Sequence, residues 1–161
     1  MSMRLAEKCA VIGLGNILRC DDGIGIKLLE VLRGKWQDRG IVLQDFGILS
    51  FDLAHHIEKY SKVLLIDAID AGLEPGALKI FQLPDVRLGF QEKKLSSHEL
   101  SLSDLLRLCE MLGVKADIYI AGIQVKDVSY GLVMTEEVEA AKPRIIDGIN
   151  SFIESWVMVD S

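Results

Sequence analysis

The sequence predicts an α/β fold of three layers, α/β/α, in which helices cover both faces of a mostly parallel, twisted five-stranded sheet with one antiparallel strand. Two observations support this prediction. Short apolar segments alternate along the chain with longer segments whose apolar residues recur at helical spacing. One short segment, residues 62–68, is apolar almost throughout, which is typical of a central parallel strand buried on both faces.

The first half of the chain is expected to form three strands, at residues 9–14, 41–46 and 62–68, with a helix in each gap. The first helix, 23–37, should bury a face made of Ile24, Leu28, Val31 and Leu32. The second helix should begin at a Ser50 cap and continue to about residue 60. Its inward residues are expected to be Phe51, Leu53, Ala54 and Ile57.

The second half begins with a turn signal at residues 74–76, Glu-Pro-Gly, and a strand at 77–83 close enough in sequence to return antiparallel. A polar loop is expected at 84–94 and a helix at 97–112, where Ser96 and Glu99 have capping-box spacing. A fifth strand follows at 117–125. A last helix, capped by Thr135, should run to about residue 158, with Pro143 kinking or restarting it. No linker interrupts the pattern, so residues 1–161 are expected to form a single domain.

Bulk properties exclude several classes of function. The net charge of -6 argues against nucleic acid or an anionic membrane as a partner. No apolar stretch approaches the roughly 20 residues that cross a bilayer, and residues 1–8 do not resemble a secretory signal. The three cysteines are too few and too scattered for a disulfide framework. We therefore expect a cytoplasmic monomer.

The most informative segment is residues 13–25, Gly-Leu-Gly-Asn-Ile-Leu-Arg-Cys-Asp-Asp-Gly-Ile-Gly, which joins the first strand to the first helix. Such a turn lies at the carboxyl end of the sheet, where α/β proteins place their sites. Its glycines allow a partner to approach the backbone, and its paired carboxylates favour a cation or a peptide over a pyrophosphate. A dinucleotide site has weaker support: Leu18 replaces the third glycine of that fingerprint, and only Asp45 could serve as the ribose-binding acid.

Three side chains are candidates for a metal site. Asp22 follows the first strand, Asp67 ends the third strand, and His98 begins the helix at 97–112. The carboxyl ends of parallel strands share one edge, so the two carboxylates can come close. Two carboxylates and one imidazole suit a divalent transition metal, with the remaining positions left to water or substrate. Taken singly, each residue has a simpler explanation, as a helix cap or a surface residue.

Three motifs in order give the chain a family resemblance: Gly13-x-Gly15-Asn16 running into Asp21-Asp22-Gly23-x-Gly25, then Leu-Ile-Asp67-Ala, then Ser-x-His98-x-Leu-x-Leu-x-Asp104-Leu-Leu. In these motifs the chain resembles the hydrogenase maturation endopeptidases over nearly its whole length. The resemblance implies that Asp22, Asp67 and His98 are the metal-binding and catalytic residues. Residues 45–48, Asp-Phe-Gly-Ile, depart from the Asp-Gly-Gly-Thr often found there and indicate a different substrate subgroup.

The resemblance implies a peptidase that removes a C-terminal extension from the large-subunit precursor of a [NiFe]-hydrogenase after nickel insertion. The substrate would carry the nickel, and the free enzyme would bind divalent metal only weakly. Water activation by a carboxylate, as in an aspartyl protease, and by the metal both remain open. Asp21 is either a helper or a cap of the following helix, and the loop at Gly47 is a candidate for binding the extension. The alternative is a non-enzymatic nucleotide- or metal-binding module on a Rossmann-like sheet, in which His98 would have no role.

Overall fold

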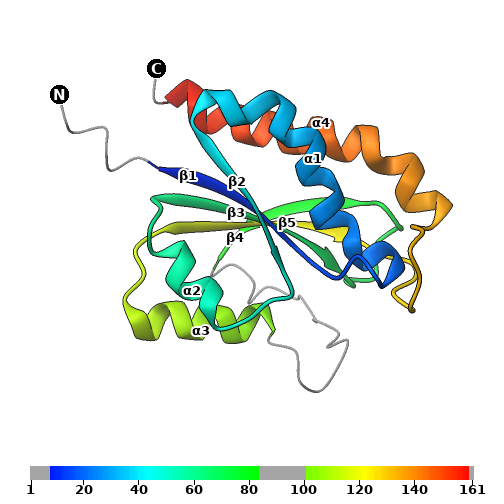
Figure 1. The fold of residues 1–161 in the computed structure, drawn as a ribbon, viewed down its shortest axis with the longest axis horizontal. Helices are drawn as coiled ribbons and strands as arrows, with labels where there is room; N and C mark the ends of the chain where they lie inside the picture. The colour runs from blue at the N-terminus through cyan, green and yellow to red at the C-terminus, as the bar shows by residue number, and fades with distance from the viewer. Residues whose placement is uncertain (1–7, 84–100, 160–161) are drawn as a thin grey trace.

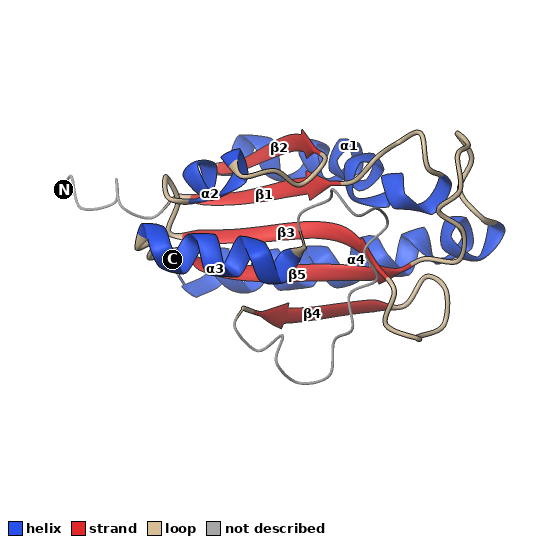
Figure 2. Cartoon of the chain, turned by 90° about the horizontal axis from the view of Figure 1, so that it is seen from below, coloured by secondary structure: helices blue, strands red, loops and turns tan. Residues whose placement is uncertain are grey.

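A computed structural model describes residues 8–83 and 101–159, and its strands form one sheet in the order β2-β1-β3-β5-β4. The strands are β1 (Cys9–Leu14), β2 (Ile41–Gly47), β3 (Lys62–Ile69), β4 (Leu78–Gln82) and β5 (Asp117–Gln124). Strands β2, β1, β3 and β5 are parallel, and β4 is antiparallel at one edge. Figure 2 shows this arrangement. The predicted mostly parallel sheet with one antiparallel strand is confirmed.

The antiparallel strand pairs with a partner that is distant in sequence. The prediction that the strand after residue 76 returns antiparallel is confirmed. β4 pairs with β5, with Leu78 opposite Ile123 and Gln82 opposite Tyr119. β5 occupies the place next to β3, where its almost entirely buried residues are covered on both faces. The half-exposed β4 is better suited to the edge.

Within residues 8–83 and 101–159, four α-helices cover the two faces of the sheet, as predicted (Figure 1). They are α1 (Ile24–Trp36), α2 (Asp52–Ile57), α3 (Leu102–Leu112) and α4 (Glu136–Val159). Helices α1 and α4 lie on one face, and α2 and α3 lie on the other. Two short 3-10 turns, η2 (Cys20–Gly23) and η3 (Gln37–Arg39), flank α1. Within the described ranges, no helix is both long enough and apolar enough to span a membrane.

The core consists of two apolar clusters, one on each face of the sheet. Along β1, Val11 belongs to the cluster under α1 and α4, whereas Ile12 belongs to the cluster under α2 and α3. Ile66 and Leu65 of β3 divide between the clusters in the same way. This alternation follows from the two-residue period of a strand. It explains why the central strands are apolar throughout and why their ends alone carry polar groups.

Two residues predicted to be buried are exposed. Val31 of α1 faces solvent, and the buried face of that helix instead includes Leu29 and Trp36. Phe51 is also exposed, because α2 begins at Asp52 rather than at a Ser50 cap. Both predictions were therefore wrong. The other residues predicted to face inward are buried: Ile24, Leu28 and Leu32 of α1, and Leu53, Ala54 and Ile57 of α2.

Two helix boundaries also differ from the prediction. Helix α3 begins at Leu102, after a capping box in which Ser101 and Asp104 bond to each other's backbone N–H. The predicted start at residue 97 was too early, and the predicted box residues, Ser96 and Glu99, lie outside the described part of the chain, as does the loop at 84–94. Helix α4 is one element that includes Pro143, so the chain does not restart there.

Candidate active site

The candidate site lies where the chain order reverses in the sheet. From β1 the chain passes through α1 to β2 on one side, and from β2 it returns through α2, on the opposite face, to β3 on the other side of β1. Ligands of open α/β sheets bind outside the carboxyl ends of the strands at such a point. Asp22, in the turn after β1, and Asp67, near the end of β3, are the acidic residues that the sequence predicted there.

Close backbone packing brings the segments that carry these aspartates together. Gly25 lies in the first turn of α1, and a Cβ atom on it would stand 2.3 Å from the carbonyl oxygen of Ile66, the residue before Asp67. Gly15 has a φ of +135°, and a Cβ there would stand 2.0 Å from the carbonyl oxygen of Asp22. Only glycine fits these positions. The glycine-rich turn therefore depends on glycine at both positions.

Each predicted carboxylate is oriented by a backbone N–H. The N–H of Asn16 donates to Oδ2 of Asp22 at 2.8 Å, and the N–H of Ala68 donates to Oδ1 of Asp67 at 2.8 Å. Asp22 is buried, whereas Asp67 is half-buried at the sheet edge. These bonds fix the direction in which each carboxylate points.

The third predicted ligand, His98, lies outside the described residues. Across residues 8–83 and 101–159 the structure has no group of three or more His, Cys, Asp or Glu side chains placed to hold a metal ion. The described part of the chain therefore contributes two of the three predicted ligands. The complete ligand set of Asp22, Asp67 and His98 stays a prediction.

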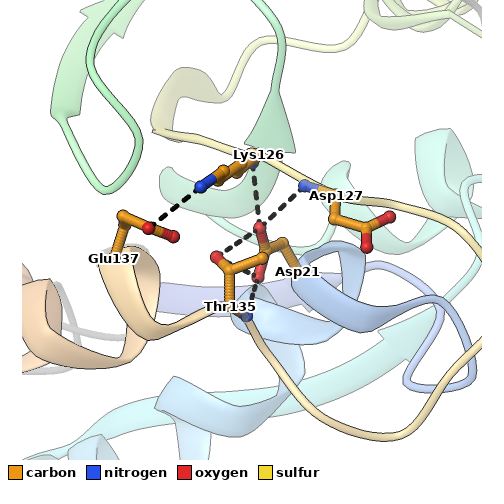
Figure 3. Close-up of polar contacts among 5 residues, drawn as sticks. All are labelled: Asp21, Lys126, Asp127, Thr135 and Glu137. Carbon is orange, nitrogen blue, oxygen red and sulfur yellow. Dashed lines mark hydrogen bonds and ion pairs between the residues drawn. The ribbon is translucent and has the colours of Figure 1, made fainter.

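Asp21 has a role that the sequence did not reveal (Figure 3). Its side chain is fully buried, and Oδ2 accepts hydrogen bonds from the N–H groups of Lys126 and Asp127 at 2.9 and 3.0 Å. Oδ1 accepts the N–H of Thr135 at 2.7 Å, and the Thr135 hydroxyl donates to both oxygens. Asp21 thus fastens both ends of the β5–α4 loop, residues 125–135, to the turn that carries Asp22.

An exposed ion pair lies beside this buried carboxylate. Lys126 Nζ is 3.0 Å from Oε1 of Glu137 in the first turn of α4 (Figure 3). Hydrogen bonding to Lys126 lowers the pKa of Glu137, and the same bond raises the pKa of Lys126. Thr135 precedes α4, and its carbonyl accepts the N–H of Glu139. The predicted helix start at Thr135 is confirmed.

A second buried polar residue, Gln124, organises the loop after β3. Its Oε1 accepts the N–H groups of Ala71 and Leu73 at 2.8 and 3.2 Å. Its amide nitrogen donates to Asp70 Oδ1 and to the carbonyl of Val125. Sequence analysis missed this residue, although a glutamine that ends an apolar strand was an available signal.

The remaining candidates lie around the same edge or away from it. Gly47 accepts the N–H of Gly15 at 2.8 Å, which brings the β2–α2 loop beside the glycine-rich turn. His55 is exposed, whereas His56 is half-buried, with its Nε2 2.6 Å from the Gln44 amide nitrogen and its ring against that of Phe46. The three cysteines are free thiols. Burial, with a smaller contribution from Glu110, raises the pKa of Cys109 to about 11.

Comparisons with known proteins show the family to which this chain belongs. A sequence model of the hydrogenase maturation protease family matches residues 26–151, more than three quarters of the chain. Hydrogenase expression/formation protein HoxM of Cupriavidus necator is 29% identical over 148 residues, which cover 90% of this chain and 73% of HoxM. Coenzyme F420 hydrogenase subunit delta of Methanothermobacter thermautotrophicus is 30% identical over 150 residues, covering 86% of this chain and 90% of that protein.

Solved structures share the fold. The hydrogenase maturating endopeptidase HybD from E. coli superposes with a TM-score of 0.77 at 22% identity, covering 92% of this chain and 93% of HybD. The [NiFe] hydrogenase maturation protease HybD from Thermococcus kodakarensis has a TM-score of 0.66 at 25% identity, with 90% and 98% of the two chains covered. The fold, the site at the switch point and the match over most of the sequence lead to one conclusion: this chain is a peptidase that belongs to the hydrogenase maturation protease family.

Proposed function

We propose that this protein removes a C-terminal extension from the large-subunit precursor of a [NiFe]-hydrogenase after nickel has been inserted. The observation that supports this most directly is the placement of Asp22 after β1 and of Asp67 near the end of the neighbouring parallel strand β3, in a member of the maturation protease family. Membership of a peptidase family favours this function over a non-enzymatic binding module. The protein is proposed to act as one domain, in the cytoplasm and as a monomer.

Asp22, Asp67 and His98 are proposed to bind the nickel that the precursor carries. Carboxylate oxygen and imidazole nitrogen are suitable ligands for a divalent transition metal. The backbone N–H groups of Asn16 and Ala68 fix the direction of the two carboxylates, which reduces the cost of binding the ion. The nickel is part of the substrate in this proposal, so the free enzyme needs only a weak divalent-metal site.

The carboxylates also have the chemistry for the hydrolytic step. Peptide hydrolysis adds water across the C–N bond, so a base must accept a proton from water and the leaving amine must receive one. Asp22 or Asp67 is proposed to act as that base, and the nickel supplies a Lewis acid when the precursor is bound. The loop at Gly47, bonded to Gly15, is proposed to hold the extension as an extended peptide.

The experiment compares three aspartate variants on a nickel-loaded precursor, with cleavage measured by the mass of the precursor's C-terminus. Asp22→Asn and Asp67→Asn keep the side-chain shape and remove the charge, so we expect cleavage to fall by about 100-fold or more, the scale of a lost acid–base group. Asp45→Asn is the matched control, because Asp45 is exposed on β2 and outside the proposed ligand set. Equal activity of all three variants would refute the assigned roles.

A further inference from the structure

Large apolar side chains are exposed on the two loops that follow β1 and β5. Tyr130, Leu132 and Val133 are 83%, 70% and 78% exposed. The residues that form this surface, called here the two-loop patch, are Ile17, Leu18, Tyr130, Leu132 and Val133. Single exposed apolar residues are common on proteins, but a contiguous group on a soluble protein marks a surface that another molecule covers.

Hydrogen bonds hold the two loops of the patch side by side. The N–H of Gly131 donates to the carbonyl of Leu18 at 2.8 Å, and the N–H of Cys20 donates to the carbonyl of Gly131 at 2.9 Å. The Arg19 guanidinium donates to the Val128 carbonyl at 3.0 Å and lies over the Tyr130 ring, 5.3 Å from its centre. The two-loop patch is therefore a built surface, and little conformational freedom is lost when a partner covers it.

The buried Asp21 carboxylate anchors this surface from below. It binds the backbone at both ends of the β5–α4 loop, at Lys126 and at Thr135, so the exposed residues between them are presented on a fixed base. Asp21 is adjacent in sequence to Asp22. The same turn therefore carries a proposed nickel ligand and one half of the two-loop patch.

Exposed apolar residues continue along this edge of the sheet. Ile48 and Phe51 lie between β2 and α2, and Leu73 lies in the loop after β3. All of these loops follow the carboxyl ends of strands, where the proposed site lies. An apolar rim around the site is more than a short extended peptide requires, because such a peptide is bound mainly through its backbone.

The charge on the patch indicates the kind of surface that binds there. Arg19 lies within it, and Lys27 donates from Nζ to the carbonyl of Leu132 at 3.3 Å. These cations stand out in a chain with a net charge of -6. A partner with an apolar centre and carboxylates at its rim is complementary.

We propose that the two-loop patch docks the folded body of the hydrogenase large-subunit precursor, beside the site that cleaves its C-terminal extension. This inference rests on the proposed function and adds to it a second contact, remote from the scissile bond. Affinity for the precursor then comes from the apolar patch, and the aspartates act on the extension that docking brings to them.

The test is the double variant Leu132→Ser/Val133→Ser, assayed on a nickel-loaded precursor. Both side chains are mostly exposed, so the fold should be kept, and an unchanged melting temperature checks this. We expect KM for the precursor to rise about tenfold and kcat to stay within about twofold, because truncated interface residues weaken binding. Met111→Ser is the control: Met111 is 82% exposed on α3, near the amino end of β5 and away from the site, and its KM should equal that of the wild type.

The outcomes separate docking from the proposed function. If the wild type cleaves the precursor and the double variant has an unchanged KM, docking at the two-loop patch is refuted and the proposed function stands. If the wild type sediments as a dimer, the double variant sediments as a monomer and the two have the same KM, the patch is an interface between two copies of the enzyme and the docking proposal is wrong. If the wild type does not cleave a nickel-loaded precursor, the proposed function fails and the proposed occupant fails with it.

Discussion

The substitution Asp21→Asn should destabilise the protein strongly, although it replaces one side chain with another of the same shape. The buried carboxylate accepts three backbone N–H bonds and the Thr135 hydroxyl. An amide has one acceptor oxygen, so its NH2 group must face at least one backbone N–H. An unsatisfied buried donor costs about 1–3 kcal/mol, and the remaining bonds lose the strength that the charge gives them. We expect a loss of about 3 kcal/mol in the free energy of unfolding.

Urea denaturation measures this loss, and a fall of about 6–12 °C in melting temperature should accompany it for a chain of this size. Hydrogen exchange at the amides of Lys126, Asp127 and Thr135 reports the same bonds one by one and should become faster. Asp127→Asn is the control, because Asp127 is exposed and its carboxylate bonds to Ser129, only two residues away. It should change stability by less than about 0.5 kcal/mol. Equal stability and equal exchange in the two variants would refute the reasoning.

Three further predictions concern other parts of the molecule. Gly15→Ala should lower the free energy of unfolding by more than about 3 kcal/mol, because of the backbone clash and the positive φ at that position. Gly34→Ala is the control, because Gly34 lies on α1 with open space around it, and calorimetry should find this variant as stable as the wild type or more stable. Because the pKa of Cys109 is raised to about 11 in the folded protein, the thiol of the unfolded chain ionises at a lower pH than the folded one. Stability should therefore fall as pH rises from about 9 to 11, and a Cys109→Ala variant should lack that part of the fall in urea denaturation. Titration calorimetry with nickel should show one weak site in the wild type and none in Asp67→Ala; equal binding by both would remove Asp67 from the ligand set.

The sheet could be predicted because its causes are local. Segments such as 62–68 are apolar almost throughout because both faces of the strand are covered, and that pattern is visible in the sequence. The turn residues before α1 also carry a local signal, since Gly15 and Gly25 are required by close backbone contacts. Asp22 and Asp67 could be placed at one edge because parallel strands end there.

The errors arose at the starts of helices and where contacts between residues distant in the sequence decide the outcome. Phe51 fits the apolar spacing of α2 but is exposed, because α2 starts at the next residue. Asp21 was expected to help in the site or to cap the following helix. Its donors are more than 100 residues away, at Lys126, Asp127 and Thr135, and no local pattern marks them. The start of α3 was misplaced because two serine caps with suitable spacing occur in succession, and Ser101 is the one that α3 uses.

The central claim is that the proposed site acts on a hydrogenase precursor that already carries nickel. The most direct test uses enzyme that has been treated with a chelator and then separated from it. This enzyme is incubated with nickel-loaded precursor and, separately, with nickel-free precursor, and the mass of the precursor's C-terminus is measured. The account predicts loss of a single C-terminal extension from the nickel-loaded precursor and no change in the nickel-free one. Efficient cleavage of the nickel-free precursor would contradict nickel recognition, and Asp22 and Asp67 would then be an acid–base pair that acts without the metal.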